Sequence, residues 1–280
     1  MRLLQVQDGS NSSLVDFSDS SVPPYAILSH TWGPNGEEVT YQDLFSGTAK
    51  EKTGYRNFTF SREQAAKDGL HHFWIDTCCI DKASSAELSE AITSMFRWYS
   101  DSAQCYVFLS DVSVEEQKTD YDDFNFMWEF AFRTSRWFSR GWTLQELLAP
   151  SVLRFFSREG RQLGDKLSLE KVISEITHIP ILALRNKPLN TFSVQERMSW
   201  TKNRQTTRKE DEAYALLGLF GISMLPMYGE GKEHALKRLR KKIIKYPGDE
   251  LQQFHSKVVL EATQALSSSK TRMFTVIYAK

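Results

Sequence analysis

Short apolar runs alternate with helical patterns along the first 160 residues, and this alternation constrains the fold more than any other feature. Runs typical of buried strands lie at Tyr25–Leu28, Phe73–Ile75, Cys105–Leu109 and Val152–Phe156. Strands that alternate with helices usually form a parallel sheet with helices on both faces. The pattern therefore predicts an α/β fold, in which ligands bind at the carboxyl ends of the strands.

Two of the intervening helices are predicted to begin at capping boxes, Ser61 with Gln64 and Ser84 with Glu87. The second helix has apolar residues at i, i+4, i+7 and i+11, which form one buried face: Leu88, Ile92, Met95 and Tyr99. From about residue 167 onward the pattern is mainly helical, and it includes a predicted helix from Arg208 to about Leu219, capped by Thr207 with Glu210.

The rest of the chain divides by composition. The polar segment Asp8–Ser21 is typical of a loop or a weak hairpin, and the acidic, aromatic segment Ser113–Phe132 has no clean period, so we interpret it as an insertion or a lid. The predicted organisation is an N-terminal segment 1–24, an α/β core 25–160, a helical second half 161–246 and a C-terminal tail 247–280.

Composition excludes several classes of function. Lys and Arg together number 35, as do Asp and Glu, so the formal net charge is zero and no nucleic-acid partner is expected. Three cysteines without a C-x-x-C pair, and no His, Cys or carboxylate cluster with ligand spacing, predict neither a disulfide framework nor a metal site. No stretch approaches the roughly 18 apolar residues of a membrane span, and no signal pattern opens the chain, so we expect a cytoplasmic protein.

Three motifs together resemble the fungal heterokaryon-incompatibility (HET) domain: Tyr25–Gly33 (YAILSHTWG), Trp74–Lys82 (WIDTCCIDK) and Ser139–Pro150 (SRGWTLQELLAP). The resemblance continues at Arg197–Trp200 and Thr206–Tyr214. It implies a role in programmed cell death on non-self recognition, and a distant relationship to the TIR domain, whose flavodoxin-like parallel sheet agrees with the alternation above.

Some TIR domains cleave NAD with one glutamate on a short helix, in a Trp-Cys-x-x-Glu-like context. Here Trp142 and Glu146 occupy the corresponding place, with Thr143 where that pattern often has Cys. The resemblance thus implies an NAD glycohydrolase that uses NAD as substrate and needs no prosthetic group. Its products would be nicotinamide and ADP-ribose, or a cyclic or variant form.

Helical geometry places Leu144, Leu147 and Leu148 on one side of this helix, opposite Trp142 and Glu146. A carboxylate in a dry pocket can stabilise the ribosyl cation that forms when nicotinamide leaves, by electrostatics like those of glycosidases. We therefore predict Glu146 as the catalytic residue. Without the resemblance, the commoner interpretation of such a residue is a solvated glutamate on a surface helix.

Substrate-binding residues are predicted in the loops that follow the first two strands. Ser29 and His30 could donate hydrogen bonds to ribose or phosphate, although His30 could equally be a buried histidine that locks its loop to a neighbouring carbonyl. Trp32 and Gly33 are also predicted to bind the substrate, and Trp32, like Trp142, is a candidate to stack on one of its rings. Asp76 could bind a ribose, but bracing a loop is its commoner role.

Four arginines are candidates for the phosphates of a dinucleotide, because the planar guanidinium fork suits them: Arg140, Arg197, Arg204 and Arg208. Arg140 stands first because it adjoins the proposed catalytic helix. The alternative function is a death-signalling module without catalysis that associates with itself. Both hypotheses predict a homo-oligomer, with an upstream sensor protein as a further partner.

Overall fold

The structure is a computed structural model that describes residues 1–7, 12–114 and 128–245 of the chain. The chain divides into two compact units, residues 1–236 and 237–280, and only residues 237–245 of the second are described. These residues form the end of helix α11 (Lys232–Lys245). The sheet and the candidate site both lie in the first unit.

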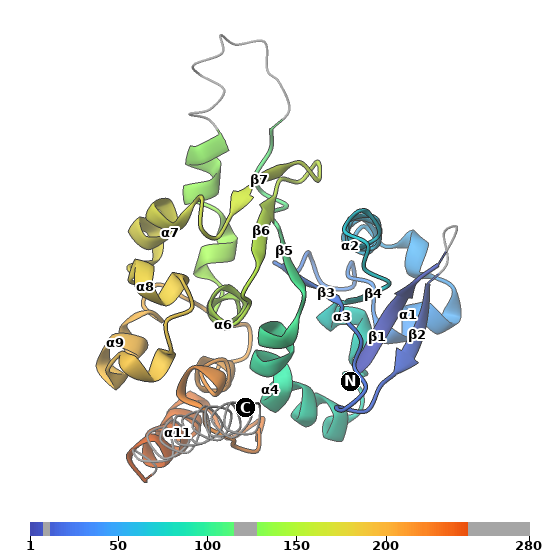
Figure 1. The fold of residues 1–280 in the computed structure, drawn as a ribbon. Helices are drawn as coiled ribbons and strands as arrows, with labels where there is room; N and C mark the ends of the chain where they lie inside the picture. Colours follow the sequence, from blue (N-terminus) through green and yellow to red (C-terminus); the bar gives the residue numbers. More distant parts are fainter. Residues whose placement is uncertain (8–11, 115–127, 246–280) are drawn as a thin grey trace, which may run out of the picture. The chain divides into compact units, whose positions relative to one another are not determined.

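A mixed sheet of the described strands has the order β2-β1-β4-β3-β5-β6-β7 (Figure 1). The strands are β1 Arg2–Val6, β2 Ser12–Asp16, β3 Ala26–His30, β4 His72–Trp74, β5 Gln104–Phe108, β6 Leu153–Phe156 and β7 Gln162–Asp165. The four central strands β4-β3-β5-β6 are parallel, which confirms the predicted parallel sheet. The outer strands pair antiparallel to their neighbours, so the polar N-terminal segment is part of a hairpin, β1–β2, that extends the sheet.

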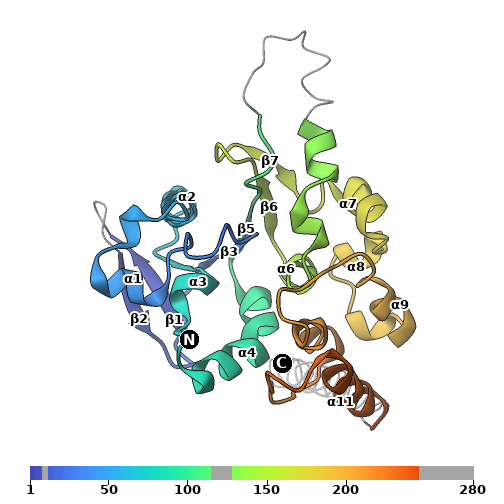
Figure 2. The ribbon, with the colours of Figure 1, turned by 180° about the vertical axis from the view of Figure 1, so that it is seen from behind.

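Helices cover both faces of the sheet, as the alternation predicted (Figures 1 and 2). On one face, helix α2 (Tyr55–Lys67) packs the ring of Phe60 4.8 Å from Phe108 and 5.0 Å from Phe156. On the other, helix α4 (Ser85–Asp101) packs Trp98 5.7 Å from Trp74. Other α-helices are α1 Tyr41–Ser46, α3 Asp76–Cys79, α6 Thr143–Leu148, α7 Glu170–Thr177, α8 Ile181–Leu184, α9 Val194–Ser199 and α10 Asp211–Tyr214, and residues 128–133 are helical as well.

The order of the parallel strands locates the site. Strand β4, the second parallel strand in the chain, lies on one side of β3, and the third, β5, lies on the other. The winding direction therefore reverses between β3 and β5, in the order typical of flavodoxin-like folds, and such a switch point leaves a crevice at the carboxyl ends of the strands.

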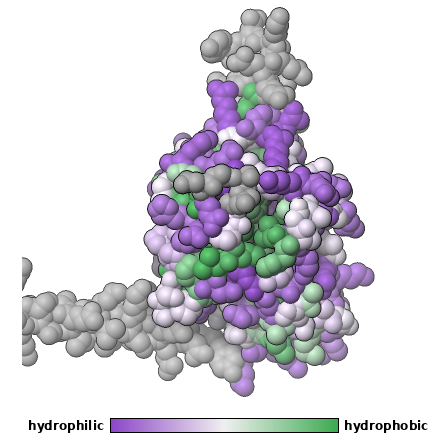
Figure 3. All heavy atoms as spheres, turned by 90° about the vertical axis from the view of Figure 1, so that its right-hand side faces the viewer, coloured by the Kyte–Doolittle hydropathy of each residue, from purple (hydrophilic) through white to green (hydrophobic). Residues whose placement is uncertain are grey.

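The side of the molecule that carries the β1–β2 hairpin and α1 shows a band of apolar side chains between hydrophilic areas (Figure 3). On α1, Phe45 is 69% exposed, although its ring lies 4.9 Å from that of Tyr41. An exposed apolar area of this kind is typical of a surface that contacts another molecule.

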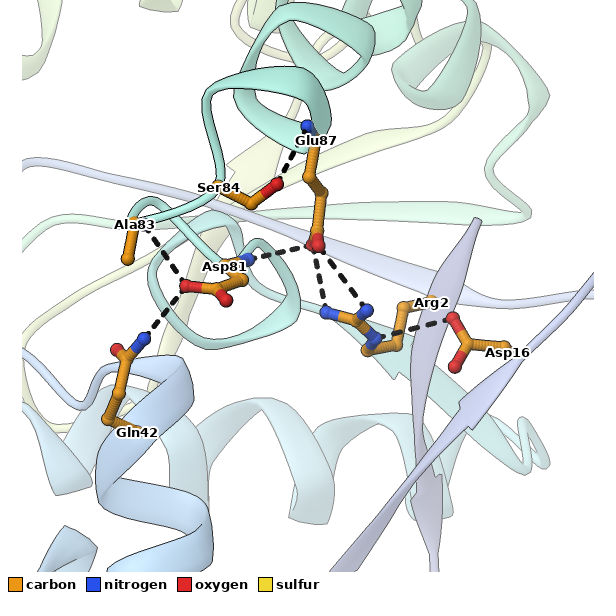
Figure 4. Close-up of polar contacts among 7 residues, drawn as sticks. All are labelled: Arg2, Asp16, Gln42, Asp81, Ala83, Ser84 and Glu87. Atoms are coloured by element: carbon orange, nitrogen blue, oxygen red, sulfur yellow. Dashed lines mark hydrogen bonds and ion pairs between the residues drawn. The ribbon is translucent and has the colours of Figure 1, made fainter.

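One predicted capping box is confirmed as a cap and the other is wrong. Ser84 accepts a hydrogen bond from the Glu87 N–H at 3.3 Å and begins α4, but the Glu87 carboxylate turns instead to the Asp81 N–H and to Arg2 (Figure 4). Ser61 lies inside α2 and donates to the Asn57 carbonyl. Helix α2 begins upstream of Ser61 because burial of Phe58 against Phe73 outweighs the local capping signal.

The predicted helix from Arg208 to Leu219 is also wrong. It is replaced by α10 and the 3-10 helix Gly218–Phe220, and Glu210 accepts instead from the N–H groups of Gly229 and Gly231. Residues 213–217 are all buried, so no amphipathic face exists there. A Cβ on Gly218 would lie 2.1 Å from the Cβ of Phe96, so this segment crosses α4 too closely for a larger residue.

The predicted insertion Ser113–Phe132 falls partly outside the described residues, at 115–127, and the tail 247–280 falls wholly outside them. Phe132, the last residue of the predicted insertion, is a core residue whose ring lies 5.1 Å from that of Phe155. Its burial contradicts the prediction that it belongs to an insertion. None of the described helices has the length and apolarity needed to cross a membrane.

Candidate active site

A cavity of about 210 Å³ lies where β3 and β4 end, and four separate parts of the chain line it. The lining residues are His30, Trp32, Asp76, Ile80, Lys82, Leu88, Ile92, Met95, Tyr99, Arg140, Trp142, Thr143, Glu146, Thr207, Arg208, Asp211 and Tyr228. Most of the predicted site residues, Glu146 among them, are therefore brought together at this cavity, whereas Ser29 and Gly33 lie outside its lining.

Glu146 is a buried carboxyl group at the cavity, with its residue 8% exposed. It belongs to α6, in which every residue is buried, so the predicted polar side of this helix does not face solvent. The Ser29 hydroxyl donates a hydrogen bond to Glu146 Oε2, and the Trp137 indole N–H donates to Ser29 Oγ at 2.8 Å. This chain of donors fixes the carboxylate and excludes the alternative of a solvated surface glutamate.

The surroundings of Glu146 favour its neutral form more than water does. Burial raises the pKa of Glu146 to about 7, and the nearby charge of Asp76 contributes to the rise, while the Ser29 hydrogen bond, His30 and Arg140 oppose it. A carboxyl group whose pKa is close to neutrality, in a cavity, is typical of a functional site.

His30 lines the cavity and locks its loop, although to a carboxylate and not to the predicted carbonyl, while its role in substrate binding stays a prediction. Its Nε2 lies 3.3 Å from Glu38 Oε2, and Glu38 also accepts the Gly33 N–H at 2.7 Å. Burial lowers the pKa of His30, but the Glu38 hydrogen bond and the charges of Asp76 and Glu146 outweigh it and raise the pKa overall. Because the Gly33 N–H donates to the same Glu38 carboxylate, Gly33 also helps to hold this loop in place.

Two aromatic walls flank the cavity, and in each an indole N–H donates to a carboxylate. On the first wall, Trp32 Nε1 donates to Asp76 at 3.1 Å, and Lys82 Nζ lies 3.3 Å from the same oxygen and 3.8 Å from the centre of the Trp32 ring. Asp76 thus braces the loop, its commoner predicted role, while it also lines the cavity.

On the second wall, Trp142 Nε1 donates to Asp211 Oδ2 at 3.0 Å, and the Tyr228 hydroxyl donates to Asp211 Oδ1 at 2.8 Å. Burial raises the pKa of Asp211, against these two hydrogen bonds. The Arg208 guanidinium lies 4.1 Å from the centre of the Tyr228 ring.

The four candidate arginines separate into two pairs. Arg140 and Arg208 line the cavity. Arg204 instead donates from Nη1 to the Arg140 carbonyl and to Thr143 Oγ1, both at 2.9 Å, and Arg197 donates to the Leu219 carbonyl at 2.7 Å. Arg204 therefore holds the chain at the start of α6. Arg197 holds the backbone of the 3-10 helix Gly218–Phe220.

Sequence reasoning missed Glu38, Trp137, Asp211 and Tyr228. Trp137 is also a core aromatic, since its ring lies 5.6 Å from Phe155. Asp211 and Tyr228 lie in the helical second half of the chain. Asp211 is 69 residues beyond Trp142, so no local sequence pattern indicates the contact between the two side chains.

These features define a class of protein: a doubly wound α/β domain with a buried, hydrogen-bonded glutamate between two aromatic walls at the switch point. Within the part of the chain that is described, no group of three His, Cys, Asp or Glu side chains could hold a metal ion. Such a site can stabilise a developing positive charge on a bound molecule.

Comparison with known proteins identifies the family. Residues 25–130 match the model of the heterokaryon incompatibility protein (HET) family. Over 249 residues the chain is 54% identical to vegetative incompatibility protein HET-E-1 of Podospora anserina, an alignment that covers 89% of this chain and 18% of that protein. No solved structure is significantly similar to the chain. The chain contains a HET domain, which confirms the resemblance seen in its motifs.

Proposed function

We propose that this domain is an NAD glycohydrolase that acts in a cell-death response of heterokaryon incompatibility, with Glu146 as its catalytic carboxylate. The observation that supports the proposal is the burial of Glu146 at the cavity, with the Ser29 hydroxyl on Oε2. Two aromatic walls and two arginines at the same cavity fit the rings and phosphates of a dinucleotide.

In the proposed reaction, the bond between ribose C1′ and the pyridinium nitrogen breaks, and its electron pair stays on nicotinamide, which leaves as a neutral molecule. The ionised Glu146 stabilises the positive charge that develops on the ribose. Water then bonds to C1′ and loses a proton, which gives ADP-ribose. One NAD and one water become nicotinamide, ADP-ribose and one proton.

The substrate itself helps to ionise the carboxyl group. The pyridinium ring carries a positive charge, and a positive charge near a buried carboxyl group lowers its pKa. The Trp32 ring already holds the Lys82 ammonium by a cation–π contact, and a pyridinium ring would be attracted to an indole in the same way.

Nicotinamide release from NAD by the purified protein tests the proposal. Glu146→Gln, which keeps the size and the hydrogen-bond acceptor but not the charge, is expected to lower kcat by about 100-fold or more. Glu175→Gln, at a carboxylate that is 62% exposed, is the matched control and should retain the rate. Equal rates for wild type and Glu146→Gln would refute the role of Glu146.

We further propose that activity depends on self-association through an exposed apolar surface that includes Phe45 of α1, whose exposed fraction is 69%. Phe45→Ser should weaken association and lower the specific activity at a given concentration, whereas Leu182→Ser, at a 53% exposed residue of α8, should change neither. Sedimentation and nicotinamide release, measured over the same concentration series, test this. If killing of host cells survives Glu146→Gln while association is kept, the non-catalytic module is the correct function.

A further inference from the structure

Two cations at the cavity form no ion pair with a carboxylate of the described residues. Among the ion pairs of the described residues, none includes Arg140 or Arg208, whereas Arg2, Arg133 and Arg185 each pair with a glutamate. Arg140 is half-buried and Arg208 is exposed, whereas Glu146, which lines the same cavity, is buried. Positive charges placed in this way favour an anionic ligand.

The backbone holds the two arginines beside each other although they are far apart in sequence. The Gln205 N–H donates to the Ser139 carbonyl at 2.7 Å, and the Gly141 N–H donates to the Gln205 carbonyl at 2.8 Å. Across this short parallel bridge, Arg140 Nη1 donates to Thr207 Oγ1 at 3.3 Å. The pair is therefore preorganised, which lowers the entropy cost of binding a ligand.

Arg208 is oriented by an aromatic ring. Its guanidinium lies 4.1 Å from the centre of the Tyr228 ring, and the Tyr228 hydroxyl is held by Asp211. A guanidinium on a ring face is attracted through its plane, so the N–H groups around its edge can still donate to an anion.

The cavity thus contains charges of both signs, with the carboxyl groups of Glu146, Asp76 and Asp211 in it together with the two arginines. NAD also carries both signs, because its nicotinamide is cationic and its diphosphate is anionic. We infer that Arg140, Arg208 and the Thr207 hydroxyl bind the diphosphate of a dinucleotide, while the nicotinamide ribose lies at Glu146. This inference rests on the proposed function and deepens it, because it makes the diphosphate the feature that selects the substrate.

Binding of ADP-ribose, measured by titration calorimetry, tests the subsite without any turnover. Arg140→Gln and Arg208→Gln are each expected to weaken binding by about 10-fold or more, since each removes charge-assisted hydrogen bonds. Arg208→Lys, which keeps the charge and loses the planar fork, should fall between wild type and Arg208→Gln. Arg97→Gln is the matched control, because Arg97 pairs with Asp19 outside the cavity lining, and it should leave binding unchanged.

Kinetics on two substrates separate this role from general damage to the site. Nicotinamide riboside has the scissile bond but no diphosphate, so Arg208→Gln should lower kcat/KM for NAD by about 10-fold more than kcat/KM for the riboside. The loss on NAD should appear mainly in KM. A thermal melt of each variant by circular dichroism shows whether it is folded.

The outcomes distinguish the subsite from the proposed function. If wild type releases no nicotinamide but binds ADP-ribose in an arginine-dependent way, the subsite stands and the glycohydrolase proposal fails. If NAD is cleaved and the arginine variants bind ADP-ribose as tightly as wild type, the subsite alone is overturned. Equal losses on NAD and on the riboside would also overturn it, because they would show a structural role.

Discussion

At the scale of the residue, Glu146 combines a functional position with a cost to folding. Burial raises the pKa of Glu146 to about 7 from an ordinary 4.5, so between these values the folded chain holds a proton that the unfolded chain releases. Stability therefore falls as pH rises through this window, by about 3 kcal/mol in total. Glu146→Gln removes this titration. We therefore expect the difference in unfolding free energy, variant minus wild type, to be about 3 kcal/mol larger at pH 8 than at pH 4.5.

Urea denaturation of both proteins at the two pH values measures this difference. Groups that do not interact with Glu146 titrate alike in the two proteins, so their contributions cancel, whereas the charge of Glu146 raises the pKa of His30 and His30 therefore contributes to the difference. A difference in unfolding free energy that stays constant across this pH range would show that Glu146 does not titrate near neutrality.

Ser29 is a positioning residue whose loss should move a pH profile. Its hydrogen bond lowers the pKa of Glu146, so Ser29→Ala should raise that pKa and shift the acid limb of kcat/KM for nicotinamide release to higher pH. The buried Trp137 N–H would also lose its acceptor, at a cost of about 1–3 kcal/mol in unfolding free energy. A loss of stability with an unmoved acid limb would leave Ser29 only a structural role.

At the scale of the element, the segment before α6 crosses residues 205–207 at a distance that only glycine permits. A Cβ on Gly141 would lie 2.4 Å from Cγ2 of Thr206. Gly141→Ala should therefore lower the unfolding free energy by about 1–3 kcal/mol and weaken ADP-ribose binding, since it displaces Arg208 from Arg140.

Thr206→Ser tests the cause of that loss, because it removes Cγ2 and keeps the hydroxyl that donates to the Arg208 carbonyl. In a double-mutant cycle, Gly141→Ala combined with Thr206→Ser should recover about 1 kcal/mol or more of the loss. Strict additivity of the two substitutions would mean that the methyl group is not the obstacle.

Elements that carry a strong local pattern could be predicted, and elements set by distant contacts could not. The buried strands and the apolar face of α4 follow from runs and periodicity, and Glu146 followed from a motif. The predicted capping box at Ser61 was wrong because Phe58 packs on Phe73 and α2 begins earlier. The predicted helix after Thr207 was wrong because Gly218 lies against Phe96 of α4. The wall of Asp211 and Tyr228 depends on contacts with Trp142 that no short window of sequence contains.

At the scale of the whole molecule, the N-terminal hairpin is joined to the helix that lines the cavity. Arg2 Nη1 donates to Glu87 Oε1 at 2.8 Å, and Glu87 stands at the amino end of α4 (Figure 4). Arg2→Met should lower the unfolding free energy by about 1 kcal/mol, because both side chains are mostly buried.

Asp16→Asn supplies the contrast, since Asp16 pairs with the same arginine at 3.3 Å but is 79% exposed. We expect almost no change from Asp16→Asn, because exposed ion pairs contribute little. Chemical denaturation of both variants checks this, and equal losses would contradict the special role of the Arg2–Glu87 pair.

The four stretches that enclose the cavity begin at His30 and end only at Tyr228, whereas the family match stops at residue 130. A gene trimmed at that boundary would encode neither Glu146 nor the second aromatic wall. A gene trimmed at residue 160 would encode Glu146 but not the cavity residues between Thr207 and Tyr228. If the proposed function is correct, toxicity screens that express such trimmed genes would score them as harmless. That outcome would reflect where the gene was cut and would say nothing about the chemistry of the intact domain.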